Sequence, residues 1–529
     1  MPPGVPPTLG LSILNGCLMT HYDFLIIGAG AAGCVVARTI AQRFSTASVG
    51  LLEAGPEGRV PPFAHSDLNS VFETWNPSSN WLLKTTPQTG LNNRQVDITQ
   101  GKVLGGGTSV NAMMYVRGDY SVIEEWYRRS GYSDNWSVSE YQSAFKAIET
   151  YHHAESHPLR GRNGRISIRE TPHPSSSADA FVDALVEAGY TRGDFNGTSQ
   201  RNTGGLMQLN INPDGTRCSS ARAYLSDPLP TNLSIELGTE VISLTIRKGR
   251  CQGVNTADGR TISADRIVLS AGAFLSPALL MASGIGDPSQ LSQHGIRCEV
   301  ANQNVGRNLS DHMRAMVAYE STVDPGVTEY LCEAALFISS GLLPSPEPDI
   351  QINFSAGVEG FIPTQFIGNP PPSHTVIFVP VLTRPVSRGS VKLLGSTIGQ
   401  GIAIDPGYLT QYHDVKTYIR SLEIIRNLAS TESLKSYCHR EICPGATNPA
   451  DYFRDNAQTI WHPVGSCSMG ASPTDSVVDP LFTVYGVDNL SIVDASVLPS
   501  LPSGNPQAAI FAMAHIASKT ITDNVRAHS

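Results

Sequence analysis

Residues 24–55, FLIIGAGAAGCVVARTIAQRFSTASVGLLEAG, hold the pattern that decides the fold. A short apolar run at 24–27 is followed by Gly28, Gly30 and Gly33, which fill the slots of G-x-G-x-x-G, and then by residues with helical periodicity. Gly28 permits a tight turn, Gly30 lets a pyrophosphate approach the backbone, and Gly33 lets the helix pack closely on the strand. The pattern predicts a dinucleotide-binding strand, turn and helix, with a glycine-rich structural turn as the alternative.

Glu53 supplies the acidic residue that such a unit requires. It ends a second predicted strand, 49–52, and lies 20 residues after Gly33. A carboxylate at this point can accept hydrogen bonds from both hydroxyls of an adenosine ribose. Strands, helix and acidic residue are all in place, which favours nucleotide binding over a plain turn.

Length and composition bound the class of protein. The chain has 529 residues, which predicts two or three folded regions. Hydrophobic residues make up 40% and charged residues 16%, and no uninterrupted apolar run approaches the roughly 20 residues of a membrane helix. The net charge of -9 disfavours nonspecific nucleic-acid binding. We therefore expect a soluble protein with no membrane span and no nucleic-acid partner.

Cysteine use and the first residues bear on the compartment. The nine cysteines include no C-x-x-C pair, and their odd number argues against a disulfide framework. Residues 1–22 have no basic n-region, and their apolar stretch at 9–14 is shorter than a usual signal core. These features predict a cytoplasmic protein, although they do not exclude secretion.

A second glycine-rich stretch follows a variable region. Residues 56–67 and 73–95 are rich in Pro, Asn and Ser, which predicts surface loops with little regular structure. Residues 99–118, TQGKVLGGGTSVNAMMYVRG, then place three glycines ahead of Thr108, Ser109 and Asn111. This order predicts a loop followed by a helix with polar caps, and a second site where a ligand approaches the backbone closely.

Five stretches, in order along the chain, resemble blocks of the glucose-methanol-choline (GMC) flavoprotein oxidoreductases. They are GKVLGGGTSVNAMMYVRG (101–118), GTRCSSARAYL (215–225), GAFLSPALLMASGIGDP (272–288), VGRNLSDH (305–312), and TIWHPVGSCSMG (459–470) with VDASVLPSLPSGNPQAAIFAMA (493–514). The resemblance runs from about residue 20 to 520, and the combination is far more specific than any one block.

The resemblance implies an α/β fold, α+β overall. A Rossmann-like FAD-binding domain would be interleaved with a substrate domain built on an antiparallel sheet. The FAD-binding region would span 20–311, the substrate region 312–455, and a C-terminal segment 456–520 would return to the flavin domain with the catalytic residues. Short β-type runs in 349–356, 375–382 and 390–395, followed by a helical pattern at 414–430, fit a second sheet in the substrate region.

The resemblance also assigns site residues. His462 in W-H-P-V-G-S-C matches the catalytic base, and imidazole titrates near neutral pH. Asn505 in S-G-N-P-Q matches its partner, whose amide can hold the substrate oxygen. FAD would contact residues from all of the blocks, namely Gly28, Gly30, Ala31, Ala32, Gly33, Glu53, Ala54, Val103, Gly107, Asn111, Ala112, Met113, Met114, Val241, Ala271, Trp461, Asp494, Ala495, Pro506 and Gln507. The slot in which some members carry a flavin-linking histidine is Val110, so we expect non-covalent FAD.

Other polar residues remain outside this assignment. His152, His153 and His157 share a polar loop, but no Cys, Asp or Glu completes a tetrahedral set, so we expect no metal. Glu333 lies in the apolar run LCEAALF and is either an edge residue or a wall of the substrate cavity, where it could attract a cationic substrate. We expect structural roles for three further candidates, which are His515, Cys34 and Cys467.

The implied activity is FAD-dependent oxidation of a small-molecule alcohol to an aldehyde or ketone. His462 would be the base, flavin N5 the hydride acceptor, and oxygen or a quinone-type acceptor would reoxidise the flavin. A hydroxynitrile lyase of the same fold and an inactive flavin-binding protein are the alternatives. The sequence leaves the substrate open, and the protein could be a monomer or a homo-oligomer.

Overall fold

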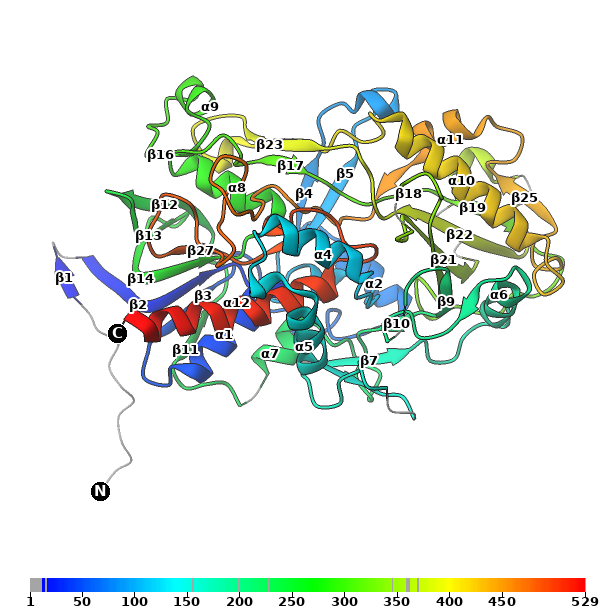
Figure 1. Ribbon diagram of the computed structural model, residues 1–529, viewed down its shortest axis with the longest axis horizontal. Helices are drawn as coiled ribbons and strands as arrows, with labels where there is room; N and C mark the ends of the chain where they lie inside the picture. The colour runs from blue at the N-terminus through cyan, green and yellow to red at the C-terminus, as the bar shows by residue number, and fades with distance from the viewer. Residues whose placement is uncertain are drawn as a thin grey trace.

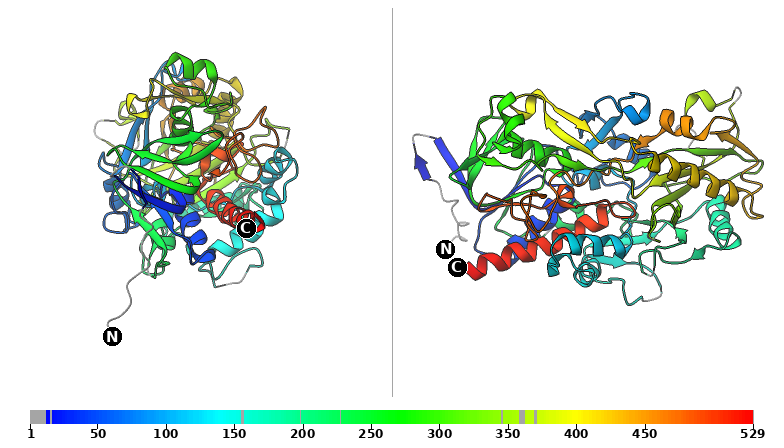
Figure 2. Two further views of the ribbon diagram at one scale, coloured as in Figure 1. Left: turned by 90° about the vertical axis from the view of Figure 1, so that its left-hand side faces the viewer. Right: turned by 45° about the horizontal axis from the view of Figure 1, so that its top comes forward.

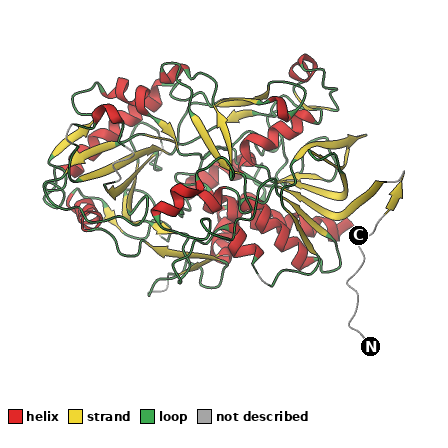
Figure 3. Cartoon of the chain, turned by 180° about the vertical axis from the view of Figure 1, so that it is seen from behind, coloured by secondary structure: helices red, strands yellow, loops and turns green. Residues whose placement is uncertain are grey.

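The computed structural model describes residues 12–528 except 15–16, 155–156, 198, 227, 345, 358–361 and 369–370. Most of residues 1–22, on which the prediction about a signal segment rests, lie outside the described residues or have undescribed side chains. The molecule is elongated, with a sheet at each end and helices flanking both sheets (Figures 1 and 3). This mixed α/β architecture agrees with the predicted fold class.

We call the two sheet-containing ends of the molecule the first and second layers. The first layer contains a parallel sheet. Its parallel strands lie in the order β11 (Leu233–Glu236), β3 (Val49–Leu52), β2 (Cys17–Ile27), β14 (Thr261–Leu269) and β27 (Leu490–Ile492). The hairpin of β12 (Val241–Arg247) and β13 (Arg250–Thr256) pairs antiparallel with β14, and β1 (Ser12–Leu14) pairs with β2. Strand β3 is buried along its whole length, as expected for a parallel strand covered on both faces.

Register aligns the carboxyl ends of the central strands. Ile27 of β2 pairs with both Leu52 of β3 and Leu269 of β14. The residues that follow these strands, Gly28, Glu53 and Ser270, therefore meet at one edge of the sheet. In open parallel sheets this edge is where ligands bind.

We call the strand, turn and helix at 24–43 the nucleotide cradle. Packing requires two of its glycines. Gly28 has φ +96°, and a Cβ there would lie 2.5 Å from the Ser270 carbonyl oxygen. A Cβ at Gly33 would lie 1.9 Å from the Gly28 carbonyl oxygen, so Gly33 lets helix α1 (Ala31–Arg43) sit against the turn. Helix α12 (Gln507–His528) packs against α1, and the two run side by side in the turned views (Figure 2).

The second layer is a nine-stranded, mainly antiparallel sheet. Its order is β25 (Arg440–Cys443), β19 (Val317–Glu320), β22 (Thr375–Leu382), β21 (Ile350–Ala356), β20 (Ala334–Ile338), β9 (Thr203–Leu206) and β8 (Thr191–Arg192), with β18 (Met313–Arg314) joining β22 to β26 (Gln458–Thr459). Helices α10 (Tyr412–Ala429) and α6 (Ser176–Glu187) pack on this sheet. Strands β21 and β22 and helix α10 confirm the predicted second sheet and its helix.

One predicted strand of this sheet was misplaced. Strand β23 (Gly389–Leu393) belongs to a separate three-stranded sheet with β17 (Arg307–Leu309) and β24 (Ile402–Asp405). This small sheet lies against α8 (Gly272–Ala282) of the first layer, and the Val391 N–H donates to the Gly306 carbonyl oxygen at 2.7 Å. The pairing partner, which periodicity does not reveal, decided the position of this strand.

The prediction of loops was wrong for part of 73–95. This segment contains the end of α2 (Leu68–Thr74) and the strand β4 (Asn80–Lys84), which forms a hairpin with β5 (Asp97–Gly101). The hairpin lies between the two layers (Figure 1). The loop prediction rested on the polar composition of this segment. Along β4, however, the half-buried Trp81 and Leu83 alternate with exposed residues, which is the period-two pattern of a strand.

The remaining elements connect these layers. The helices are α3 (Gly107–Val110), α4 (Tyr120–Arg129), α5 (Val138–Ile148), α7 (Ser220–Leu225), α9 (Pro288–Gln293) and α11 (Pro449–Asn456), and the short strands are β6 (Glu149–Tyr151), β7 (Ile166–Glu170), β10 (Gln208–Leu209), β15 (Ile285–Gly286) and β16 (Val300–Ala301). No helix among the described residues is long and apolar enough to cross a membrane. The division at 312 and 456 stays a prediction, although α6, β8 and β9 of the first region lie in the second layer.

Candidate active site

A cavity of about 370 Å³ lies between the two layers and is lined by both. All of the residues predicted to contact FAD or to act in catalysis line this cavity, except Gly33 and Val103. Gly33 packs against the cradle turn, as described above. Val103 is fully buried in a small cluster with Phe63 and Val110, so it supports the cavity wall from behind.

Three glycines open the first-layer wall of the cavity. Among the described residues, apart from the adjoining chain, no heavy atom lies within 4 Å of the position that a Cβ would take at Gly30, Gly107 or Gly272. At Gly272 the backbone itself favours glycine, because φ is +84°. At Gly30 and Gly107 protein packing does not require glycine, whereas a ligand pressed against the backbone would. Helix α1 begins beside Gly30 with no side-chain cap, which leaves its first amides available to a phosphate. These features fit a dinucleotide.

Glu53 lies at the end of β3 and faces the same cavity. Its Oε2 accepts from the Ala29 N–H and its Oε1 from the Gly55 N–H, each at 2.9 Å. Burial raises the pKa of this carboxyl to about 7, against the effect of the two N–H donors. Each carboxylate oxygen can accept a second hydrogen bond, so the residue fits the two ribose hydroxyls predicted from the sequence.

The glycine-rich stretch 105–111 differs from its prediction. Helix α3 is a single turn that begins after Gly106 at φ +52° and has no side-chain cap. The hydroxyls of Thr108 and Ser109 instead donate to the Gly105 and Leu104 carbonyl oxygens. They fix the preceding turn, and the chain then leaves the helix at Asn111.

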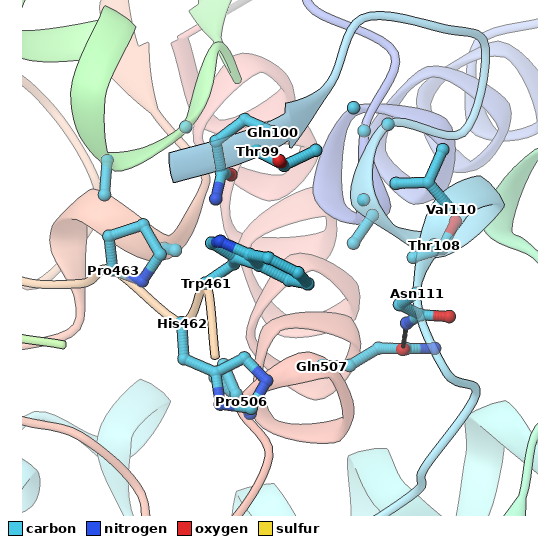
Figure 4. Close-up of a pocket in the computed structure, with 18 of the residues that line it drawn as sticks. Thr99, Gln100, Thr108, Val110, Asn111, Trp461, His462, Pro463, Pro506 and Gln507 are labelled. Atoms are coloured by element: carbon cyan, nitrogen blue, oxygen red, sulfur yellow. Dashed lines mark hydrogen bonds between the residues drawn. The ribbon is translucent and has the colours of Figure 1, made fainter. Parts of the chain in front are cut away.

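Asn111 links the start of α12 to the block 215–225. Its Nδ2 donates to Oε1 of Gln507 at the start of α12, as Figure 4 shows. Its Oδ1 accepts from Nη1 of Arg217 at 2.9 Å. Arg217 is fully buried, and the sequence prediction missed its role although it lies in the block 215–225. It determines which way the Asn111 amide points.

Asp494 lines the cavity, but its oxygens are engaged within the protein. Its Oδ2 accepts from the Gly272 N–H and the Ser276 hydroxyl, and its Oδ1 from the Ser496 N–H. Burial raises the pKa of this carboxyl. These bonds hold the start of α8 beside Ala495, and Ala271 and Val241 complete this part of the wall.

His462 and Asn505 meet at the junction of the two layers. Nδ2 of Asn505 lies 3.4 Å from Nε2 of His462, and the His462 backbone N–H donates to Oδ1 of Asp311 at 2.8 Å. On its other side, Nδ1 of His462 lies 3.0 Å from Nδ1 of His312. Burial lowers the pKa of His462 well below 6.5, and the neighbouring His312 lowers it further. A neutral imidazole and an amide thus face the cavity together.

Comparison with known proteins agrees with this geometry. Family models described as GMC oxidoreductase match residues 22–314 and residues 385–514. The chain belongs to the GMC oxidoreductase family. Members of this family are flavoproteins that act on CH–OH donors.

Relatives of this GMC oxidoreductase match it almost end to end. An alcohol dehydrogenase (acceptor) of Pseudomonas putida is 32% identical, over 95% of this chain and 96% of the relative. The mitochondrial choline dehydrogenase of Homo sapiens is 32% identical, over 95% and 90%. The crystal structure of pyridoxine 4-oxidase from Mesorbium loti superposes with a TM-score of 0.86 at 29% identity, over 95% of this chain and 99% of that one.

The hairpin β4–β5 supplies cavity residues that the sequence prediction missed. They are Trp81, Leu83, Thr99, Gln100 and Gly101, together with Trp75 just before the hairpin. The Trp75 ring packs edge-on against Trp461, with 5.0 Å between the ring centroids, and Figure 4 shows Trp461 in the middle of the cavity. Nζ of Lys102 lies 4.0 Å from the centroid of the Trp81 ring. The hairpin of this GMC oxidoreductase therefore forms part of the cavity wall, with Trp81 in it and Trp75 just before it.

The second layer forms the opposite wall. Its lining residues are Arg314, Met316, Leu331, Cys332, Asn353, Ser355, Ile377 and Val379. Glu333 does not line the cavity. It is fully buried, and its carboxylate accepts from the Ser175 N–H, the Ser175 hydroxyl and the Ala356 N–H. Of the two readings left open by the sequence, the structure favours a structural role.

The three residues expected to be structural, His515, Cys34 and Cys467, do not line the cavity. No group of three metal-ligating side chains occurs among the described residues. Cys34 and Cys467 are buried, and burial raises the pKa of both thiols, that of Cys34 to about 12. His515 is half-buried on α12, and its pKa is lowered to about 4 mainly by burial. These positions agree with the structural roles expected for them.

Proposed function

We propose that this GMC oxidoreductase binds FAD non-covalently and oxidises a small-molecule alcohol to an aldehyde or ketone. The observation that carries the proposal is the contact between His462 Nε2 and Asn505 Nδ2, at the point where the nucleotide cradle meets the second-layer wall. A base and an oxygen-binding donor are the two protein groups that alcohol oxidation requires.

The first-layer residues would hold the cofactor. The N-terminus of α1, Gly30 and Gly107 would bind the pyrophosphate, and Glu53 the adenosine ribose. When bound, FAD supplies the acceptor for the hydride that leaves the alcohol carbon. Val110, which lines the cavity beside Thr108, offers no nucleophile for a covalent bond to the flavin.

His462 and Asn505 would act on the substrate hydroxyl. Because burial keeps His462 neutral at physiological pH, its Nε2 can take the hydroxyl proton. Nδ2 of Asn505 can donate to the same oxygen as its negative charge develops. The largely apolar side chains of the second layer would hold the rest of the alcohol and exclude water. Oxygen or a quinone-type acceptor would reoxidise the flavin.

Anaerobic reduction of the yellow protein by primary, aromatic and amino alcohols tests the proposal. We expect at least one class to bleach the flavin, and air or a dye to restore the colour. His462→Ala should retain FAD but lose about 10²- to 10⁴-fold in the reduction rate. The matched control, His152→Ala, removes an exposed histidine outside the cavity and should reduce normally.

Three results would count against the proposal. Cyanide release from cyanohydrins without bleaching would indicate a hydroxynitrile lyase. Failure of both substrate types would indicate an inactive flavin-binding protein. A His462→Ala protein that reduces at the wild-type rate would remove this histidine from the mechanism.

A further inference from the structure

A continuous chain of hydrogen bonds passes through His462. Nε2 of His312 lies 3.0 Å from the Thr383 carbonyl oxygen, and Nδ1 of His312 lies 3.0 Å from Nδ1 of His462. Nε2 of His462 lies 3.4 Å from Nδ2 of Asn505. Both ring nitrogens of each histidine are therefore engaged, and the direction of each bond can be worked out.

The direction is fixed from the Thr383 end. A carbonyl oxygen only accepts, so Nε2 of His312 must carry a proton. A neutral His312 then has its lone pair on Nδ1, and the proton between the two Nδ1 atoms must belong to His462. A neutral His462 protonated on Nδ1 has its lone pair on Nε2, which is the nitrogen that faces Asn505.

The opposite end of the chain leads to the same direction. Nε2 of Gln351 donates to Oδ1 of Asn505 at 3.2 Å and to Oδ1 of Asn353 at 2.7 Å. With its Oδ1 turned toward Gln351, Asn505 presents its Nδ2 to His462. An amide nitrogen only donates, so Nε2 of His462 must accept.

We propose that His312 is a positioning residue that holds Nδ1 of His462 protonated and thereby leaves Nε2 as the basic nitrogen facing the cavity. This inference rests on the proposed role of His462 as the base. It goes beyond that role because it makes a second histidine, which does not itself line the cavity, responsible for which nitrogen of the base carries the proton.

The surroundings of His312 keep it neutral. Its ring is completely buried, and burial together with the nearby Arg384 guanidinium lowers its pKa to about 4, although the Thr383 and Pro502 carbonyls act in the opposite direction. The carboxylate beside it, Asp311, accepts from the Tyr408 and Thr459 hydroxyls and from the His462 backbone N–H.

The arrangement also suits the protonated state of His462. When His462 takes the hydroxyl proton on Nε2, its Nδ1–H still points at the lone pair of His312 Nδ1. The two rings cannot both be protonated, because two N–H donors would then face each other at 3.0 Å. The same hydrogen bond therefore serves before and after proton transfer, and no group has to reorient during the reaction.

Two amide substitutions separate tautomer control from packing. In His312→Asn, the side-chain oxygen can occupy the place of Nδ1 and accept from His462. In His312→Gln, the longer amide reaches toward the place of Nε2 and Thr383, and the acceptor beside His462 is lost. Both new side chains are polar and smaller than or close to histidine in volume. Both variants are measured as FAD-loaded full-length proteins of known flavin content.

The first readout is the tautomer itself. The ring ¹⁵N shifts of His462 are measured with ¹⁵N-histidine labelling, and the His462 signals are assigned by their loss in His462→Gln. We expect Nδ1–H in the wild type and in His312→Asn, and Nε2–H or a mixture in His312→Gln. An unchanged Nδ1–H tautomer in His312→Gln would overturn the proposal.

The second readout is the pH dependence of anaerobic flavin reduction. We expect His312→Gln to reduce its flavin on the order of 10²-fold more slowly on the alkaline plateau, with a shifted inflection, and His312→Asn to recover most of that loss. Equal losses in both variants would indicate packing alone and would refute tautomer control. Failure of the proposed function would be distinguishable, because the tautomer shifts do not require turnover.

Discussion

Replacing Glu53 by alanine provides the sharpest test of the nucleotide cradle. At a pH above 7, where Glu53 is ionised, two hydrogen bonds from ribose hydroxyls to the carboxylate contribute about 1.5–3 kcal/mol each, so their loss should cost about 3–6 kcal/mol of FAD binding. This corresponds to an increase in Kd of about 10²- to 10⁴-fold. Glu53→Ala should therefore purify largely without flavin.

The same substitution should weaken the apoprotein by a separate route. It leaves the buried N–H groups of Ala29 and Gly55 without their carboxylate acceptor, at about 1–3 kcal/mol each. Apoprotein melting measures this loss, and titration with FAD measures the Kd. The control Glu57→Ala removes a partly exposed carboxylate that pairs with Arg59 outside the cavity, so its FAD affinity should not change. A Glu53→Ala protein with full flavin content would refute the assignment.

Acid precipitation should leave the yellow colour in the supernatant, because Val110 cannot form a covalent bond to the flavin, and a yellow pellet would contradict this. Flavin reduction should rise with pH through an inflection below 6.5 and be level above it, because burial lowers the pKa of His462 and only its neutral form is a base. An inflection at or above 6.5 in stopped-flow data would oppose this. Asn505→Ala should cost about 2.7–4 kcal/mol in the reduction barrier, measured in the same assay, with Asn505→His retaining more activity. Gly30→Ala should lower flavin content while leaving apoprotein melting unchanged, whereas Gly33→Ala should lower the melting temperature.

The nucleotide cradle could be predicted from the sequence because its parts are local. Strand, turn, helix and the acidic residue at 53 lie within 32 residues, and each is marked by periodicity or by glycine. The structure adds which glycine serves which purpose. Gly28 and Gly33 are needed by packing and Gly30 is not, a distinction that depends on the Ser270 and Gly28 carbonyls and not on the motif.

The pH dependence expected of His462 rests on surroundings that the sequence does not reveal. Imidazole in water titrates near 6.5, and an inflection near that value follows if the ring is solvated. The structure holds the half-buried His462 beside a second imidazole, and both the loss of solvent around the ring and this neighbour lower its pKa. Burial depends on the two layers closing over the ring, which no residue near 462 in the sequence reveals.

The histidine pair depends on strands too short to leave a pattern in the sequence. Met313 of β18 pairs with Thr459 of β26, and each of these strands has two residues. The Ile460 N–H then donates to the His312 carbonyl oxygen at 3.1 Å, which places His312 and His462 on adjacent segments. Asn505 arrives from the other layer, just before α12. The proposed base would thus have its tautomer set from the second layer and its oxygen-binding partner supplied by the first, so alcohol oxidation would require both layers to be correctly packed against each other.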